Sequence, residues 1–225
     1  MQETFEKQYM PCLEIDEKFG RSEFGIMSNF VWQTDPKRLV FLLSRYKFVS
    51  KMLTGCRNAL EIGCADAFGT RIVRQAVPEV VATDIDPIFI EDCIRREQKS
   101  TWPISYRIHD ILSAPVPGSF DGVYSCDVFE HIHPKDEKRF ILNIRDSMSQ
   151  NGIAVIGCPS LESQVYASAG SKAGHVNCKS GEDLQNLWKH YFHTVLLFSM
   201  NDEVVHTGFS KLAHYLFIVC TGKKA

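Results

Sequence analysis

Short apolar runs alternate with stretches of helical periodicity through the middle of the chain. Runs rich in aliphatic and β-branched residues indicate buried strands, and apolar residues that recur every three or four positions indicate amphipathic helices. We expect strands at 58–62, 80–83, 104–108, 120–125 and 152–157, and helices at 36–53, 70–76, 88–98 and 134–148. Because strands that alternate with helices pair in parallel, the pattern predicts a doubly wound α/β sheet.

The two ends of the chain depart from this alternation. The first thirty-odd residues indicate irregular structure, and Thr34-Asp35-Pro36 then supplies a capping side chain before a proline at the first helical position. Near the other end, Ser180-Gly-Glu-Asp183 resembles a capping box that opens a helix to about residue 191. Strand-like runs follow at 194–198 and 214–220, and the lack of a long helix between them suggests an antiparallel edge.

Composition restricts the class of protein. The 225 residues suit one domain, without internal repeats, and apolar runs are too short for membrane insertion. Residues 1–11 do not resemble a secretory signal, so the expected location is cytoplasmic. The net charge of -2 disfavours a nucleic acid partner. Eight cysteines without a CxxC pair indicate free thiols rather than disulfides or a zinc site.

The strongest motif is Glu61-Ile-Gly63-Cys-Ala65-Asp66-Ala67-Phe-Gly69, which lies between the first expected strand and its helix. Asp84 ends the second strand about twenty residues later. Small residues let a backbone turn approach a ligand, and a carboxylate after the second strand accepts hydrogen bonds from ribose hydroxyls. The arrangement therefore predicts a site for an adenosine-containing cofactor.

These segments resemble the first two motifs of class I S-adenosylmethionine-dependent methyltransferases, over about residues 57–157. His109-Asp110-Ile111 is similar to the family segment that faces the adenine amino group, and Asp127-Val-Phe-Glu130-His131 is similar to the segment after the fourth strand. The resemblance implies a seven-stranded, mostly parallel, Rossmann-like sheet with one antiparallel strand at its edge. It also implies that S-adenosyl-L-methionine is the cofactor.

On this resemblance, the cofactor-binding residues are Glu61, Gly63, Cys64, Ala65, Asp84, Ile85, Asp110, Ile111 and Asp127. Three of these residues also have a purely structural interpretation: Glu61 as a strand-end carboxylate, Asp110 as a turn residue and Cys64 as a packing thiol. Asp86 is better explained as a helix cap than as a ligand.

Alanine stands at positions 65 and 67, where family members usually or often carry glycine. An alanine methyl is tolerated there if φ is negative, but it narrows the room for the methionine part of the cofactor. A nicotinamide-binding site would need G-x-G-x-x-G, which the segment from Gly63 does not supply. A domain that has kept the fold after losing the cofactor is the non-enzymatic alternative.

Asp127, Glu130 and His131 have the spacing i, i+3 and i+4, which places all three on one face of a helical turn. The pair Glu130-His131, with His175 later in the chain, resembles ubiquinone-pathway O-methyltransferases and small-RNA 2'-O-methyltransferases. That resemblance implies a divalent cation, Mg or Mn, held by Asp127, Glu130, His131 and His175. Glu130, His131 and His175 are accordingly the candidate catalytic residues. His131 or His175 as a metal-free general base, and histidines that are only hydrogen-bonded at a loop junction, remain alternatives.

The expected division is an N-terminal lid and helix (1–55), a cofactor-binding core (56–157), and acceptor loops with closing strands (158–225). The lid could equally be an aromatic strap on the sheet, and the loops at 159–168 and 201–208 could be surface connections. The favoured reaction is O-methylation of a small-molecule acceptor such as a sugar or polysaccharide precursor. A quinone-like ring and an RNA 2'-hydroxyl are the alternatives, and nothing in the pattern specifies an oligomeric state.

Overall fold

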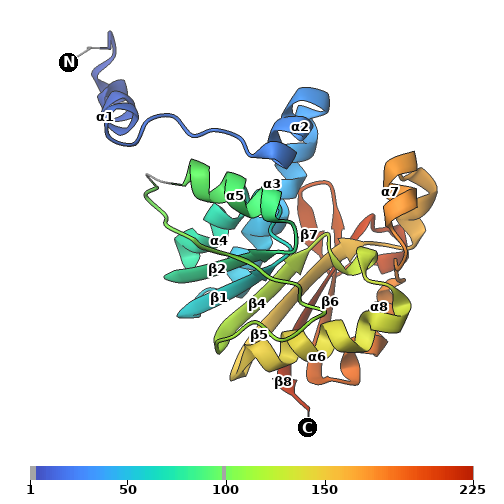
Figure 1. Cartoon of the computed structure of the whole chain (residues 1–225). Coiled ribbons are helices and arrows are strands. Elements are labelled where there is room, and N and C mark those ends of the chain that lie inside the picture. Colours follow the sequence, from blue (N-terminus) through green and yellow to red (C-terminus); the bar gives the residue numbers. More distant parts are fainter. Residues whose placement is uncertain (1–3, 98–99, 225) are drawn as a thin grey trace.

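The computed structural model describes residues 4–97 and 100–224 (Figure 1). Its strands form one sheet in the order β3-β2-β1-β4-β5-β8-β6-β7. The strands are β1 (Asn58–Ile62), β2 (Glu79–Asp84), β3 (Ser105–Ile108), β4 (Phe120–Cys126), β5 (Met148–Pro159), β6 (Phe192–Asn201), β7 (Val204–His206) and β8 (Tyr215–Lys223). The expected doubly wound α/β sheet is confirmed.

The first five strands are parallel, and antiparallel pairing begins at β8, which lies between β5 and β6. Within the described residues the sheet has eight strands rather than seven, because residues 204–206 fold back on β6 as a short hairpin. The antiparallel strand was expected at the edge, but β8 is an inner strand. Its residues Tyr215 to Cys220 are buried, as an inner strand requires.

Helices cover both faces of the sheet (Figure 1). On one face lie α3 (Pro36–Met52), α4 (Thr70–Ala76) and α5 (Pro87–Arg96), and on the other lie α6 (Glu137–Ser147) and α8 (Gly181–Lys189). Alternate residues of each strand serve the two cores: in β1, Ala59 packs towards α3 and α4, whereas Leu60 and Ile62 pack towards α6 and α8. The expected end of α5 at residue 98 lies outside the described residues. None of the described helices is long and apolar enough to cross a membrane.

The N-terminal region is helical, so the expectation of irregular structure was wrong. It contains η1 (Lys7–Tyr9), α1 (Met10–Phe19) and α2 (Ile26–Thr34). No residue of α1 is buried, which explains why no apolar face marked this helix in the sequence. The expected side-chain cap before α3 is also absent, because Asp35 makes no such hydrogen bond.

A side chain from the turn after β1 holds α2 on the body of the domain. The buried carboxylate of Asp66 accepts hydrogen bonds from the backbone N–H of Ser28, at 2.6 Å, and from its hydroxyl, at 3.2 Å. Ser28 lies in the first turn of α2, where backbone N–H groups have no partner within the helix. Phe24 adds ring contacts to Trp32 and Phe68.

A buried carboxylate joins three elements beneath the same turn. Glu61 of β1, only 1% exposed, accepts hydrogen bonds from the hydroxyls of Thr70, at the start of α4, and Tyr124, in β4. Burial raises the pKa of Glu61 from 4.5 to about 7, although both hydroxyls lower it. Glu61, which is shielded from solvent, is therefore partly protonated at neutral pH.

We predict that Glu61→Gln makes stability less dependent on pH. The pKa in the folded state lies above the unfolded value, so this group's contribution is complete below pH 4.5 and is lost as the pH rises through about 7. The difference between the two pKa values corresponds to about 3 kcal/mol. Urea titrations at several pH values should show the free energy of unfolding of the wild type falling towards alkaline pH more than that of the variant. Parallel curves would contradict this assignment.

Candidate active site

The turn after β1 approaches β2 and β4 closely. Gly63 has φ of 73°, and a Cβ there would lie 2.2 Å from Cγ2 of Val128. Its backbone N–H and that of Cys64 both donate to the carbonyl of Thr83 in β2. Glycine is therefore required at position 63 by its conformation and by its neighbour.

Ala65 and Ala67 are also in the left-handed region, with φ of 45° and 51°. The condition under which alanine is easily tolerated there, a negative φ, is therefore not met. Left-handed backbone costs a residue with a Cβ roughly 1–2 kcal/mol. The turn keeps the conformation that glycine favours while carrying two methyl groups.

A cleft of about 250 Å³ opens beside this turn, at the carboxyl ends of the parallel strands. Seven expected cofactor residues line it, namely Gly63, Ala65, Asp84, Ile85, Asp110, Ile111 and Asp127. The other two, Glu61 and Cys64, are buried beneath the turn. The cleft also includes His131 and five residues that the sequence analysis did not assign as cofactor contacts, namely Ile62, His109, Leu112, Val128 and Ile132. Each of these residues is a close neighbour of a motif residue. The sequence signal that could have identified them is their position at or after the end of a strand.

The carboxylates of the cleft combine structural bonds with free acceptor capacity. Asp84 accepts from the backbone N–H groups of Ala65, at 2.8 Å, and Asp86, at 2.9 Å. Asp110 accepts from the N–H of Leu112, so it is a turn residue as well as a cleft residue. A carboxylate has about four acceptor sites, which leaves capacity on both groups for a ligand. Asp86 is the N-cap of α5, as expected.

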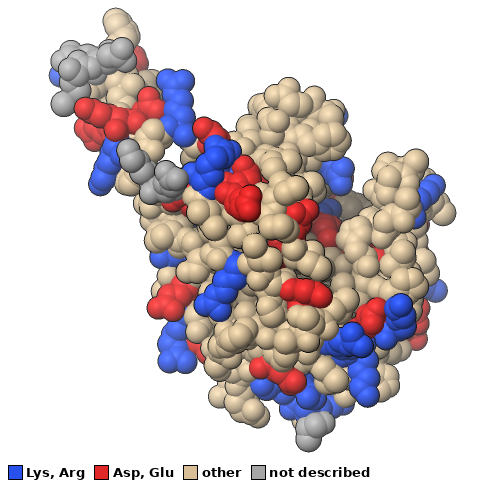
Figure 2. Space-filling view, in the orientation of Figure 1, with Lys and Arg blue, Asp and Glu red and all other residues tan. Residues whose placement is uncertain are grey.

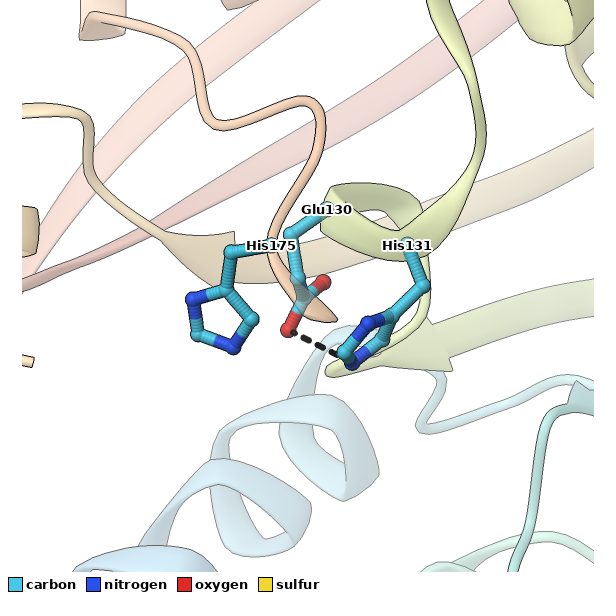
Figure 3. A group of neighbouring side chains, drawn as sticks. All are labelled: Glu130, His131 and His175. Atoms are coloured by element: carbon cyan, nitrogen blue, oxygen red, sulfur yellow. Dashed lines mark ion pairs between the residues drawn. The ribbon is translucent and has the colours of Figure 1, made fainter. Parts of the chain in front are cut away.

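Glu130, His131 and His175 form a cluster next to the cleft. Their ligand atoms lie within 4.8 Å of one another. Glu130 and His131 belong to η2 (Phe129–His131), and His175 follows α7 (Ala169–Gly174). Figure 3 shows the Glu130 carboxylate between the two imidazole rings. Backbone bonds from Val176 and Asn177 to the carbonyl of Glu130 join the two segments.

Hydrogen bonds set the tautomer of both histidines. Nδ1 of His131 lies 2.8 Å from the carbonyl of Gly174, and Nδ1 of His175 lies 2.8 Å from Oε1 of Gln164. Because these oxygens can only accept, each Nδ1 carries the proton and each Nε2 has a free lone pair. Nε2 of His131 lies 3.9 Å from Oε1 of Glu130. Metal-binding histidines are oriented by the same kind of second bond.

The carboxylate of Glu130 is buried, and Oε2 has no hydrogen-bond partner among the described residues. Burial, and then the neighbouring Asp127, raise the pKa of Glu130 well above its usual range. Burial, and then His131, lower the pKa of His175, which keeps the imidazole neutral. Two imidazole side chains and an unpartnered buried carboxyl oxygen are ligands that fit a divalent cation.

Asp127 is not part of this cluster. Its Oδ2 lies 2.6 Å from Nη1 of Arg45, a residue of α3 that sequence reasoning did not assign to the site. The structure therefore brings three of the four expected metal ligands together, and the fourth, Asp127, is ion-paired with Arg45.

The two expected acceptor loops have different structures. The first forms η4 (Glu162–Tyr166), and the second forms the β6–β7 hairpin. A shallow groove lies between η4 and η5 (Ser210–Leu212), and it is lined by Glu162, Ser163, Val165, Tyr166, Lys211, Leu212, Ala213 and His214. Gln164 of η4 does not line the groove and bonds instead to His175, so η4 contributes to both the groove and the cluster. Figure 2 shows the surface hollowed between the lobes of α2 and α7, with acidic and basic side chains in the hollow.

Residues 60–156 match the family model described as a methyltransferase domain. Two curated relatives are a ubiquinone biosynthesis O-methyltransferase of Xanthomonas campestris pv. campestris, 26% identical over 49% of this chain and 48% of the relative, and one of Xanthomonas euvesicatoria pv. vesicatoria, 28% identical over 51% and 52%. The chain thus spans about half the length of the curated relatives it matches.

One similar solved structure is the N-methyltransferase NodS from Bradyrhizobium japonicum WM9, in complex with S-adenosyl-L-homocysteine. It superposes on this chain with a TM-score of 0.64 and is 17% identical in sequence, and the match covers 93% of this chain and 97% of NodS. The methyltransferase domain of bacterial CtHen1 has a TM-score of 0.66 at 12% identity, over 82% and 100%. At sequence identities of 17% and 12%, the structural similarity shows a shared fold only. Residues 60–156 therefore match a methyltransferase domain in sequence, and the chain shares the fold of these methyltransferases.

Proposed function

We propose that this chain transfers a methyl group from S-adenosylmethionine to a hydroxyl of a small polar acceptor, such as a sugar or a polysaccharide precursor. The observation that carries the proposal is the position of the Glu130, His131 and His175 cluster, which borders the cofactor cleft through His131. A sugar hydroxyl has a pKa far above 7 and needs help to lose its proton, whereas an amine acceptor would need less. The cluster supplies that help where the methyl group would be presented.

The cleft residues would hold and orient the cofactor. The free acceptor capacity of Asp84 suits the ribose hydroxyls, and Asp110 and Ile111 suit the adenine end. The strained turn from Gly63 to Ala67 brings its backbone towards the amino-acid part. Exact positioning contributes much of the rate in a displacement at a methyl carbon.

The cluster allows two ways to remove the acceptor proton. Nε2 of His131 or of His175 has a free lone pair and could accept the proton directly. Alternatively, Glu130, His131 and His175 would hold Mg²⁺ or Mn²⁺, and the chemistry supplied by a bound cation is to lower the pKa of a coordinated hydroxyl. The unpartnered Oε2 of Glu130 favours the cation.

A hydroxylated, quinone-like ring is a second candidate acceptor. Two observations favour it: the curated relatives are named ubiquinone biosynthesis O-methyltransferases, and the groove beside η4 presents exposed apolar side chains of Val165, Tyr166 and Leu212. The polar residues Glu162, Ser163 and Lys211 of the same groove suit the sugar. An RNA 2'-hydroxyl fits less well, because the net charge is -2 and both signs of charge are interspersed on the face in Figure 2.

We predict that the wild type binds S-adenosylmethionine and its demethylated product with micromolar affinity in calorimetric titrations. Ala65→Gly should bind as tightly or up to about tenfold more tightly, because glycine adopts the left-handed conformation without strain. Asp84→Ala should weaken binding at least about tenfold, since an ionised acceptor for ribose is lost. If only the glycine variant binds, the natural chain has lost its cofactor site and the interaction-module alternative replaces the enzyme.

We predict that Glu130→Gln and His175→Ala each lower turnover at least about 100-fold while leaving cofactor affinity nearly unchanged. Turnover is followed as S-adenosylhomocysteine formed with hydroxylated sugars and hydroxylated aromatic compounds, which also separates the two acceptor classes. His190→Ala, an exposed histidine of another loop, is the matched control. Excess chelator should abolish activity and Mn²⁺ should restore it; full activity in chelator would leave only the general-base role.

A further inference from the structure

An ion pair between Arg45 and Asp127 lies beside the cluster. Arg45 of α3 projects into the domain with only 11% of its side chain exposed. Its Nη1 binds Asp127, and its guanidinium carbon lies 3.8 Å from the centre of the Tyr215 ring. Nε of Arg45 is buried without a partner among the described residues. The guanidinium is therefore held by the carboxylate of Asp127 and by the rings of Tyr215 and, at 6.0 Å, Phe41.

The backbone of Asp127 is held in place directly after β4. The residue has φ of 58°, and its N–H donates to the carbonyl of Gly157 in β5. Three residues later, Glu130 points into the cluster. With the backbone fixed at both positions, side-chain rotation decides whether the Asp127 carboxylate points towards Arg45 or towards the cluster.

The ion pair and the cluster meet at the cofactor cleft. Asp127 and His131 both line the cleft, and Asp127 is paired with Arg45 at 2.6 Å. The cluster of Glu130, His131 and His175 therefore contains one carboxyl side chain, while the carboxylate of Asp127 is compensated by Arg45. Removing the cation of Arg45 would leave a second carboxylate, 37% exposed and unpaired, at the border of the cluster.

We propose that Arg45 is a positioning residue that withholds Asp127 from the cation, so that Mg²⁺ or Mn²⁺ is bound by three protein ligands, Glu130, His131 and His175. This inference rests on the proposed function, because it assumes that the cluster binds a cation. A six-coordinate ion with three protein ligands retains open positions for water and for the oxygen of the acceptor. A fourth protein ligand would strengthen cation binding and occupy one of those positions.

The test is a double-mutant cycle on Mn²⁺ affinity, measured by loss of the free-ion paramagnetic resonance signal on the full chain without acceptor. Arg45→Met should bind Mn²⁺ about tenfold more tightly than the wild type, because the released carboxylate joins the ligands. Asp127→Asn alone should change the affinity less than about twofold, and the double variant should return to the wild-type value. Arg45→Lys retains the charge and should behave as the wild type.

The outcomes separate this inference from the proposed function. If Asp127→Asn alone weakens Mn²⁺ binding about tenfold or more, Asp127 is a ligand in the natural protein and the inference is overturned while the cation site stands. If Arg45→Met binds Mn²⁺ as the wild type does, Arg45 does not govern the ligand set. If no variant binds Mn²⁺, the cation role of the cluster falls together with the inference, whereas S-adenosylmethionine binding remains a separate measurement. Circular dichroism melts identify any variant that has lost the fold. If Arg45→Met has lost it, Asp127→Asn decides: unchanged Mn²⁺ affinity supports the inference, and a loss of about tenfold or more overturns it.

Discussion

The buried carboxyl group of Glu61 is the constraint on which the site depends. It cannot be solvated, so it has to be hydrogen-bonded within the protein. Its partners, Thr70 and Tyr124, come from the helix after the turn and from the neighbouring strand. These bonds fix where the turn leaves β1 and where α4 begins. The left-handed alanines above it are then a local strain that the fixed ends of the turn impose.

The candidate site places few fixed charges in a partly buried space. Hydrogen bonds to carbonyl oxygens keep the two imidazoles in one tautomer, Arg45 compensates Asp127, and Glu130 retains an oxygen without a partner. The two imidazoles and Asp127 are each oriented by a partner from another segment, namely Gly174 for His131, Gln164 for His175 and Arg45 for Asp127. Such preorganisation means that a ligand does not have to reorder the side chains that receive it.

The central fold could be predicted because buried parallel strands and their covering helices have strong local signals. The apolar side chains of buried strands, such as Leu60 and Ile62 of β1, can be recognised from the residue type alone. The helix caps are also local, because Asp86 bonds to a residue two positions later and Ser180 to a residue three positions later. Helix α1 buries no side chain, and β7 is only three residues long, so neither produced a periodic pattern. Their positions are set by contacts that sequence spacing does not contain.

The same distinction applies to the site. Glu130 and His131 could be found from their spacing, and His175 from the family resemblance, because these signals are local or carried by a motif. The partnership of Arg45 with Asp127 joins residues 82 positions apart and had no signal in the sequence. The left-handed φ of Ala65 was also hidden, because the motif shows the residue type and not the backbone conformation it adopts.

The bond between Asp66 and Ser28 has a consequence for the order of folding. It joins residues 38 positions apart, and Asp66 is placed to accept it only when the turn after β1 has formed. Helix α2 precedes that turn in the chain and therefore leaves the ribosome earlier, yet its docking has to wait for β1 and α4. The contacts that offset the entropy cost of closing this loop form only late in folding. The N-terminal helices should therefore be among the last elements to gain protection from hydrogen exchange and the first to lose it.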